Sequence, residues 1–152
     1  MTPDSPPSAL RRAVPDDAAA LLALHDEAFD DERRPPPAEV VRILASPAET
    51  VWVLPGPGRL DGAVVLRRLG IDLHLRDLVT HPAARGQGVG RVLLAHAEAM
   101  ARRDGARTMT VEAEEQDPRL VAWYESAGFE RSGRIEDFFH AGCSAIRLRK
   151  AL

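Results

Sequence analysis

The sequence predicts a single α/β domain built around a mixed β-sheet. Three features predict it: β-rich runs alternate with amphipathic helical runs, a glycine-rich turn joins a long strand run to a long helical run, and 152 residues suit one domain with its own core. The predicted order is β-α-α-β-β-β-α-β-α-β-β, without internal repeats. Residues 1–8 are rich in proline and serine, so we expect a disordered tail followed by one domain over residues 9–152.

The first half of the chain is expected to contain three strands and two helices. Pro15 followed by Asp16-Asp17 favours a helix start, and Ser46-Pro47 favours a helix end. The Pro-Gly-Pro-Gly run at 55–58 predicts the turn of a hairpin. The expected bounds are strands over 10–14, 50–54 and 63–69 and helices over 18–29 and 38–44.

The second half is expected to contain the longest elements. A strand over 71–80 leads into the glycine turn, and the helix after it shows apolar residues at 3.6-residue spacing up to Arg103, where Asp104-Gly105 ends it. Alternation in the next strand places Thr110 and Glu112 on the same side. The remaining expected elements are strands over 108–113, 129–135 and 145–148 and a helix over 120–127, preceded by Pro118 and stopped by Gly128.

Composition argues against several classes of protein. Hydrophobic residues make up 45% and charged residues 28% of the chain, and no apolar run approaches the roughly 20 residues that span a bilayer. A net charge of −3 argues against a nucleic-acid partner. Cys143 is the only cysteine and the five histidines show no close ligand pairing, so no metal is expected. Nothing at the N-terminus resembles a signal peptide, and we expect a cytoplasmic monomer or homodimer without a membrane partner.

The stretch Arg85-Gly86-Gln87-Gly88-Val89-Gly90 is the most informative part of the sequence. Its glycines are expected to adopt positive φ and to bring backbone N–H groups close to a ligand. The first N–H groups of a helix lack partners inside it, and the macrodipole adds about half a positive charge there, so the turn favours phosphate oxygens. Arg91-Val92 after the glycines excludes a P-loop, and the spacing differs from a dinucleotide fingerprint. A plain structural turn is the alternative.

The spacing Arg85-x-x-Gly88-x-Gly90, preceded by Leu78-Val79-Thr80-His81-Pro82 and followed by a long helix, resembles the acetyl-CoA site of the GNAT superfamily of N-acetyltransferases. A second stretch, Ala122-Trp123-Tyr124-Glu125-Ser126-Ala127-Gly128-Phe129, resembles the family's later motif, in which a helix carrying tyrosine ends at Gly-Phe. The likeness extends from about residue 10 to residue 152. It implies a mixed, mostly antiparallel sheet with a central splayed pair of parallel strands, flanked by about four helices.

In that family the pantetheine arm of CoA lies in the gap between the two splayed strands. The resemblance implies that backbone groups of Leu78, Val79 and Thr80 pair with this arm, and that an N–H near Val79 faces the thioester oxygen. The residues implied for the pyrophosphate are Arg85, Gly86, Gln87, Gly88, Val89, Gly90 and Arg91. Asp117 lies where the family usually has Asn, and an ionised Asp cannot donate to a pantetheine carbonyl as Asn does.

Acetyl transfer to an amine requires two proton movements. Tyr124 matches the family's tyrosine, which serves as general acid for the leaving CoA thiolate and contributes to the CoA site; aromatic packing is its alternative role. Glu112 aligns with the glutamate that ribosomal-protein N-acetyltransferases of the family use as base, and a solvated strand-end carboxylate is the alternative. His74 on the opposing strand is the second choice of base, because histidine is the side chain suited to proton transfer near neutral pH.

The resemblance implies an acetyl-CoA-dependent N-acetyltransferase acting on a primary amine by direct transfer in a ternary complex. The acceptor would be a small-molecule amine or a peptide or protein N-terminus, contacted by residues 30–37 and 137–143. A cationic acceptor is expected to be drawn to a run of carboxylates made up of Glu112, Glu114, Glu115 and Asp117. An acyl-CoA-binding sensor or interaction module without catalysis is the alternative function.

Overall fold

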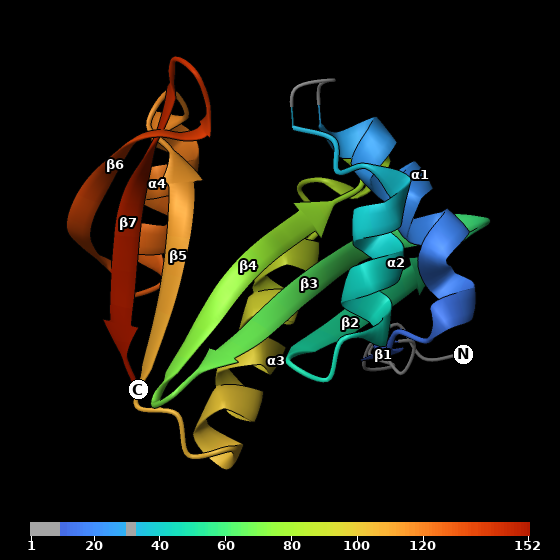
Figure 1. Cartoon of the computed structure of the whole chain (residues 1–152), viewed down its shortest axis with the longest axis horizontal. Coiled ribbons are helices and arrows are strands. Elements are labelled where there is room, and N and C mark those ends of the chain that lie inside the picture. Colours follow the sequence, from blue (N-terminus) through green and yellow to red (C-terminus); the bar gives the residue numbers. More distant parts are fainter. Residues whose placement is uncertain (1–9, 30–32) are drawn as a thin grey trace. The chain divides into compact units, whose positions relative to one another are not determined.

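The computed structural model describes residues 10–29 and 33–152 (Figure 1). The predicted tail over 1–8 and residues 30–32 of the predicted acceptor loop lie outside these described residues. Short 3₁₀ turns lie at Pro15–Asp17 and Pro82–Ala84. The helices are α1 (Ala18–Ala28), α2 (Pro37–Ala45), α3 (Val89–Arg103) and α4 (Pro118–Ser126). The strands are β1 (Arg11–Arg12), β2 (Glu49–Gly56), β3 (Arg59–Leu69), β4 (Asp72–Thr80), β5 (Thr108–Glu114), β6 (Glu130–His140) and β7 (Cys143–Ala151).

The described strands form one mixed sheet in the order β1-β2-β3-β4-β5-β7-β6. β4 and β5 pair in parallel, whereas the β1–β2, β5–β7 and β6–β7 pairs are antiparallel. The sequence of elements and the central parallel pair agree with the prediction, so the α/β fold class is confirmed. No helix of the described residues is long and apolar enough to cross a membrane.

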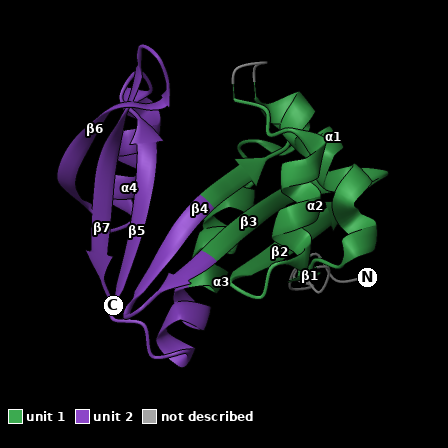
Figure 2. Ribbon diagram, viewed as in Figure 1, with its two compact units in different colours: residues 1–66, 77–97 green, residues 67–76, 98–152 purple. Residues whose placement is uncertain are grey.

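The chain divides into two compact units, coloured separately in Figure 2. The first comprises the described residues up to 66 together with residues 77–97. Within it, α1 and α2 lie on one face of the strands and the first half of α3 on the other (Figure 1). The core beneath α1 and α2 consists of aliphatic residues: Leu21, Leu24, Val40, Val51, Val53, Leu60, Ala63, Val65 and Val79.

The second unit comprises residues 67–76 and 98–152. Its strands β5, β7 and β6 and its helix α4 follow one another closely in sequence, and β4 contributes its first half (Figure 2). Alternate residues of β5 are buried, with Met109 and Val111 almost inaccessible to solvent. Their neighbours Thr110 and Glu112 are only half-buried, which matches the predicted alternation.

The last two strands differ most from the predicted bounds, β3 begins four residues before its predicted start at 63, and the first strand is shorter than predicted. β1 covers only Arg11–Arg12, because a 3₁₀ turn over Pro15–Asp17 follows it closely and Pro15 has no backbone N–H to donate to a strand ladder. β6 and β7 are longer than predicted and form a hairpin that turns at Gly142, where φ is +80°. The ladder between them shifts register between Ile135 and His140. β6 is exposed along most of its length, so polar residues are tolerated in the strand beyond Ile135.

Candidate active site

The glycine turn joins the end of β4 to the start of α3 as predicted. Gly86 and Gly88 have φ of +78° and +80°, a backbone conformation that favours glycine, and an added Cβ at either position would meet no atom within 4 Å. Gly88 O accepts the first helical hydrogen bond from Val92 N at 3.0 Å. The expectation of positive φ at Gly90 is wrong, because this residue already lies inside α3. Residues 85–88 are exposed, so a ligand can reach the turn.

Gly62 of β3 allows the first turns of α3 to approach the sheet closely. A Cβ at Gly62 would lie 2.7 Å from Val89 Cγ1, 2.8 Å from Leu93 Cδ1 and 3.0 Å from Val79 O. Any larger residue must therefore displace the start of α3 or the end of β4. Gly62 directly precedes the predicted strand over 63–69, and only the observed start of β3 at Arg59 places this glycine inside a strand.

The end of β4 extends beyond its ladder with β5. The registered pairs run from Asp72 with Thr108 to Leu75 with Val111, although β4 continues to Thr80. Val79 is buried in the core of its unit, whereas Leu78 and Thr80 are half-buried. His81 N donates to Asp61 O of β3 at 2.8 Å, which fixes the exit of the strand. The segment Leu78–Thr80 is therefore held by its own unit and has no registered β5 partner.

The structure joins the two predicted bases into one cluster. His74 Nε2 lies 2.6 Å from Glu112 Oε1, and Arg147 Nε donates to Glu112 Oε2 at 3.2 Å. Glu112 is directly opposite Arg147 in the β5–β7 ladder, and His74 lies on β4, the other neighbour of β5. The side chain of Glu112 is only 5% exposed, so the alternative of a solvated strand-end carboxylate is wrong.

The cluster favours an ionised Glu112 and fixes the tautomer of His74. Burial alone would raise the pKa of Glu112, but the hydrogen bond and charge of His74, together with Arg147, outweigh it and hold the pKa below its ordinary value. An ionised Glu112 only accepts, so His74 Nε2 must carry a hydrogen. The lone pair of a neutral His74 is then on Nδ1. Glu112 orients a base in this arrangement, and Nδ1 of His74 is the nitrogen able to take a proton.

Tyr124 is buried in an aromatic group at the end of α4. Its ring is 5.1 Å from that of Trp123 and 5.5 Å from that of Phe129, both in edge contacts. Phe129 N donates to Tyr124 O at 3.1 Å across Gly128, whose φ of +98° ends the helix as predicted. At the other end of α4, Asp117 Oδ1 accepts from Leu120 N at 3.1 Å and caps the helix. Asp therefore has a capping role at this position.

The predicted run of carboxylates is largely neutralised by partners within the chain. Glu112 binds His74 and Arg147, and Glu115 binds Arg134. Attraction of a cationic acceptor by this run is therefore weaker than the sequence suggested. Among residues 10–29 and 33–152, no group of three or more His, Cys, Asp or Glu residues could hold a metal ion.

Comparison with known proteins identifies the family. A model of the acetyltransferase (GNAT) domain matches residues 11–152. The chain belongs to the GNAT family of acetyltransferases. The peptidyl-lysine N-acetyltransferase YjaB of Escherichia coli (strain K12) is 40% identical over 63 residues, which are 41% of this chain and 40% of YjaB. An uncharacterized protein of Mycobacterium leprae (strain TN) is 28% identical over 99% of this chain and 42% of its own length. The chain thus aligns with less than half the length of these relatives.

Solved GNAT structures share the fold of this chain. The ribosomal-protein-S18-alanine N-acetyltransferase of E. coli superposes with a TM-score of 0.84, at 17% identity, over 93% of this chain and 92% of that protein. The PaiA N-acetyltransferase of Thermoplasma acidophilum, solved in complex with coenzyme A, superposes with a TM-score of 0.74, at 18% identity, over 94% and 98% of the two chains. The fold predicted from the two motifs is confirmed.

Proposed function

We propose that this protein is an acetyl-CoA-dependent N-acetyltransferase that transfers the acetyl group to a primary amine. The observation that carries the proposal is the exposed glycine turn at the start of α3, which follows the open strand segment Leu78–Thr80 after a short 3₁₀ turn. Backbone groups of this segment would pair with the pantetheine arm. The N–H groups of the turn and of the first helical turn, with Arg85 and Arg91, would hold the pyrophosphate.

The chemistry requires a base for the acceptor amine. An amine with a pKa near 10 is mostly protonated at pH 7, and it attacks only after losing a proton. We assign this proton to Nδ1 of His74, reached directly or through one water, with Glu112 holding the opposite nitrogen at 2.6 Å. His74 is therefore the proposed base and Glu112 a positioning residue, which reverses the preference drawn from the sequence.

The transfer step balances without a metal or a covalent enzyme intermediate. The amine nitrogen forms a bond to the thioester carbon while the C–S bond breaks, and the sulfur leaves as a thiolate. A backbone N–H near Val79 would stabilise the negative charge that develops on the carbonyl oxygen. We assign the proton for the thiolate to the Tyr124 hydroxyl. The nitrogen sheds its surplus proton to solvent after the attack, solvent reprotonates Tyr124, and the products are the N-acetylated amine and free CoA.

A panel of acceptors tests the proposal. Purified protein with acetyl-CoA is offered small amines, lysine-containing peptides and peptides with free N-termini, and release of the CoA thiol is recorded together with the mass of the product. Acetylated product that disappears in His74→Ala supports the proposal. If acetyl-CoA binds but none of the panel is acetylated, the alternative of an acyl-CoA-binding sensor is favoured.

A further inference from the structure

His25 is a buried charge that the proposed chemistry does not use. The residue is 5% exposed and lies on α1, where its Nδ1 is 2.8 Å from Leu21 O and its Nε2 is 3.0 Å from Asp77 Oδ2. A backbone carbonyl and a carboxylate both accept hydrogen bonds. Each ring nitrogen must therefore carry a hydrogen for both contacts to form, so His25 is an imidazolium paired with Asp77.

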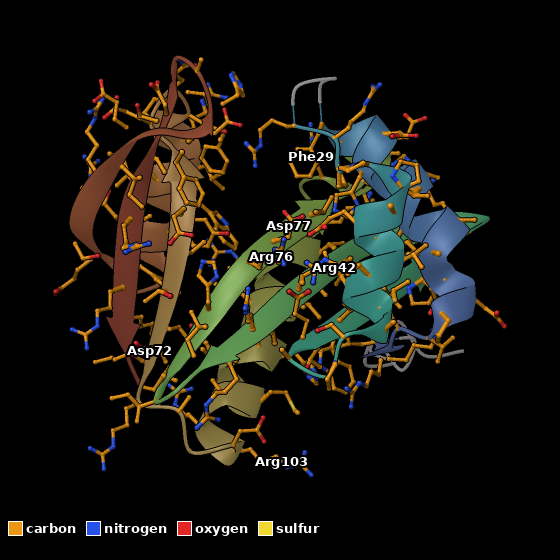
Figure 3. All side chains as sticks on the ribbon, viewed as in Figure 1. Phe29, Arg42, Asp72, Arg76, Asp77 and Arg103 are labelled. Atoms are coloured by element: carbon orange, nitrogen blue, oxygen red, sulfur yellow. The ribbon has the colours of Figure 1, made fainter. Side chains whose placement is uncertain are left out.

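The surroundings of His25 favour the charged form. Burial alone would lower the pKa of His25, but the hydrogen bond and charge of Asp77, with the Leu21 carbonyl and the nearby Asp26, outweigh it and raise the pKa above its ordinary value of about 6.5. The acidic groups that raise this pKa are Asp77 on β4 and Asp26 on α1, and Arg34 Nε lies 3.9 Å from Asp26 Oδ1. The Phe29 ring packs against the imidazole, with ring centroids 5.6 Å apart. Figure 3 labels Phe29 and Asp77.

Asp77 directly precedes the strand segment Leu78–Thr80. β4 has no registered β5 partner after Leu75, so the ladder with β5 does not hold this part of the strand. Within its own unit the segment is held in other ways: β4 neighbours β3 in the sheet, Val79 is 2% exposed in the core, His81 N bonds Asp61 O, and the Asp77 carboxylate bonds His25. Of these, the contact between Asp77 and His25 depends on a proton.

We propose that the His25–Asp77 ion pair positions the open segment Leu78–Thr80 for acyl-CoA, so that the affinity for the ligand depends on the proton carried by His25. The inference rests on the proposed function, because it assigns the backbone of this segment to the pantetheine arm. His25 and Asp77 are positioning residues in this account, and neither touches the reacting atoms.

The direction of the pH effect follows from the raised pKa of His25. The stabilisation of the fold by the His25–Asp77 ion pair is fully present below the pKa of His25 in the unfolded chain, near 6.5. It is lost as the pH rises through the higher pKa of His25 in the folded protein. A neutral His25 donates only one hydrogen bond, and the lone pair of its other nitrogen then faces an oxygen. The segment should therefore loosen, and CoA should bind less tightly, on the alkaline side of neutrality.

Calorimetric titration with free coenzyme A tests the pair. The dissociation constant is measured from pH 6 to pH 9.5 for the wild type, His25→Gln, Asp77→Asn and the double variant, with Glu27→Gln at an exposed position of α1 as a matched loss of charge. Because CoA itself titrates, variants are compared with the wild type at the same pH. At pH 6.5 each single variant should bind about 3- to 10-fold more weakly, the double variant no worse than the singles, and Glu27→Gln like the wild type.

The outcomes separate this inference from the proposed function. Wild-type affinity should converge on that of His25→Gln as the pH rises, and unchanged or fully additive affinities of the variants would overturn the positioning role. Weaker CoA binding in Asp77→Asn with unchanged binding in His25→Gln would also overturn it, because the carboxylate would then affect CoA binding independently of His25. If the wild type does not bind CoA, the proposed function fails. Amide hydrogen exchange of residues 78–80 without ligand then tests the pair, and exchange no faster in Asp77→Asn than in the wild type refutes it.

Discussion

Glu112→Gln is the most informative single change for the geometry of the cluster. The side chain is 5% exposed and accepts from His74 at 2.6 Å and from Arg147 at 3.2 Å. A charge-assisted hydrogen bond contributes about 1.5–3 kcal/mol and a neutral one about 1 kcal/mol, so the glutamine retains part of the bond to His74. Arg147 is 47% exposed, and solvent limits its pair to about 1 kcal/mol. The expected loss of unfolding free energy at pH 7 is therefore about 1–3 kcal/mol.

The loss should depend on pH in a defined direction. Although burial raises the pKa of Glu112, its contacts with His74 and Arg147 lower it overall. The stabilisation by the carboxylate is thus present above the unfolded pKa near 4.3 and disappears as the pH falls through the lower folded pKa. The wild type and Glu112→Gln should differ most at pH 6–7 and converge below about pH 4.

Urea unfolding followed by circular dichroism measures both effects. Glu115→Gln is the matched control, because Glu115 also pairs with an arginine, Arg134, but is exposed, so its midpoint should stay close to that of the wild type. A Glu112→Gln midpoint equal to that of the wild type at pH 7 would refute the cluster. A difference that persists unchanged at pH 3.5 would refute its electrostatic origin.

Three further changes test the site. His74→Ala should lower kcat/KM by about 10²-fold or more near pH 7, with the loss shrinking toward pH 9–10 as the free amine accumulates, and a pH-independent loss in the rate profile would speak against its role as base. Tyr124→Phe should lower turnover by about 10²–10⁴-fold with nearly unchanged acetyl-CoA affinity, and turnover within about twofold of the wild type would assign thiolate protonation to water. Gly62→Ala places a Cβ 2.7 Å from Val89 Cγ1 and 3.0 Å from Val79 O, so the free energy of unfolding in urea should fall by about 1–3 kcal/mol. The affinity for CoA, measured by calorimetric titration, should fall as well. Unchanged affinity would show that the start of α3 does not hold the ligand.

Local signals in the sequence were sufficient for the elements around the glycine turn. The apolar spacing and the Asp104-Gly105 stop predicted α3, which runs over Val89–Arg103 and is followed by Gly105 with φ of +79°. Period-two alternation predicted that Glu112 lies opposite the buried face of β5. These features depend on residues close together in the chain, so they could be predicted without knowledge of the tertiary contacts.

The contacts that define the site depend on strand register and could not be predicted. His74 and Glu112 were alternative bases in the sequence, and only the β4–β5 ladder shows that they are one hydrogen-bonded pair separated by 38 positions. His25 lies 52 positions from Asp77, and its place beside an apolar helical stripe suggested packing or surface exposure rather than an ion pair. Asp117 fits its helix through capping, which explains the residue without reference to CoA.

Acetyl-CoA binding at the glycine turn is the central claim, and thermal unfolding with and without acetyl-CoA tests it most directly. At about 100 times its dissociation constant the ligand should stabilise the wild type by roughly 2.7 kcal/mol, seen as a raised Tm. Gly88→Glu adds bulk and negative charge at the proposed pyrophosphate site and should abolish the shift. Gly58→Glu is the matched control, since Gly58 also has positive φ, +68°, with no atom within 4 Å of an added Cβ, and it should retain the shift. A full shift in Gly88→Glu, or none in the wild type, would contradict the account.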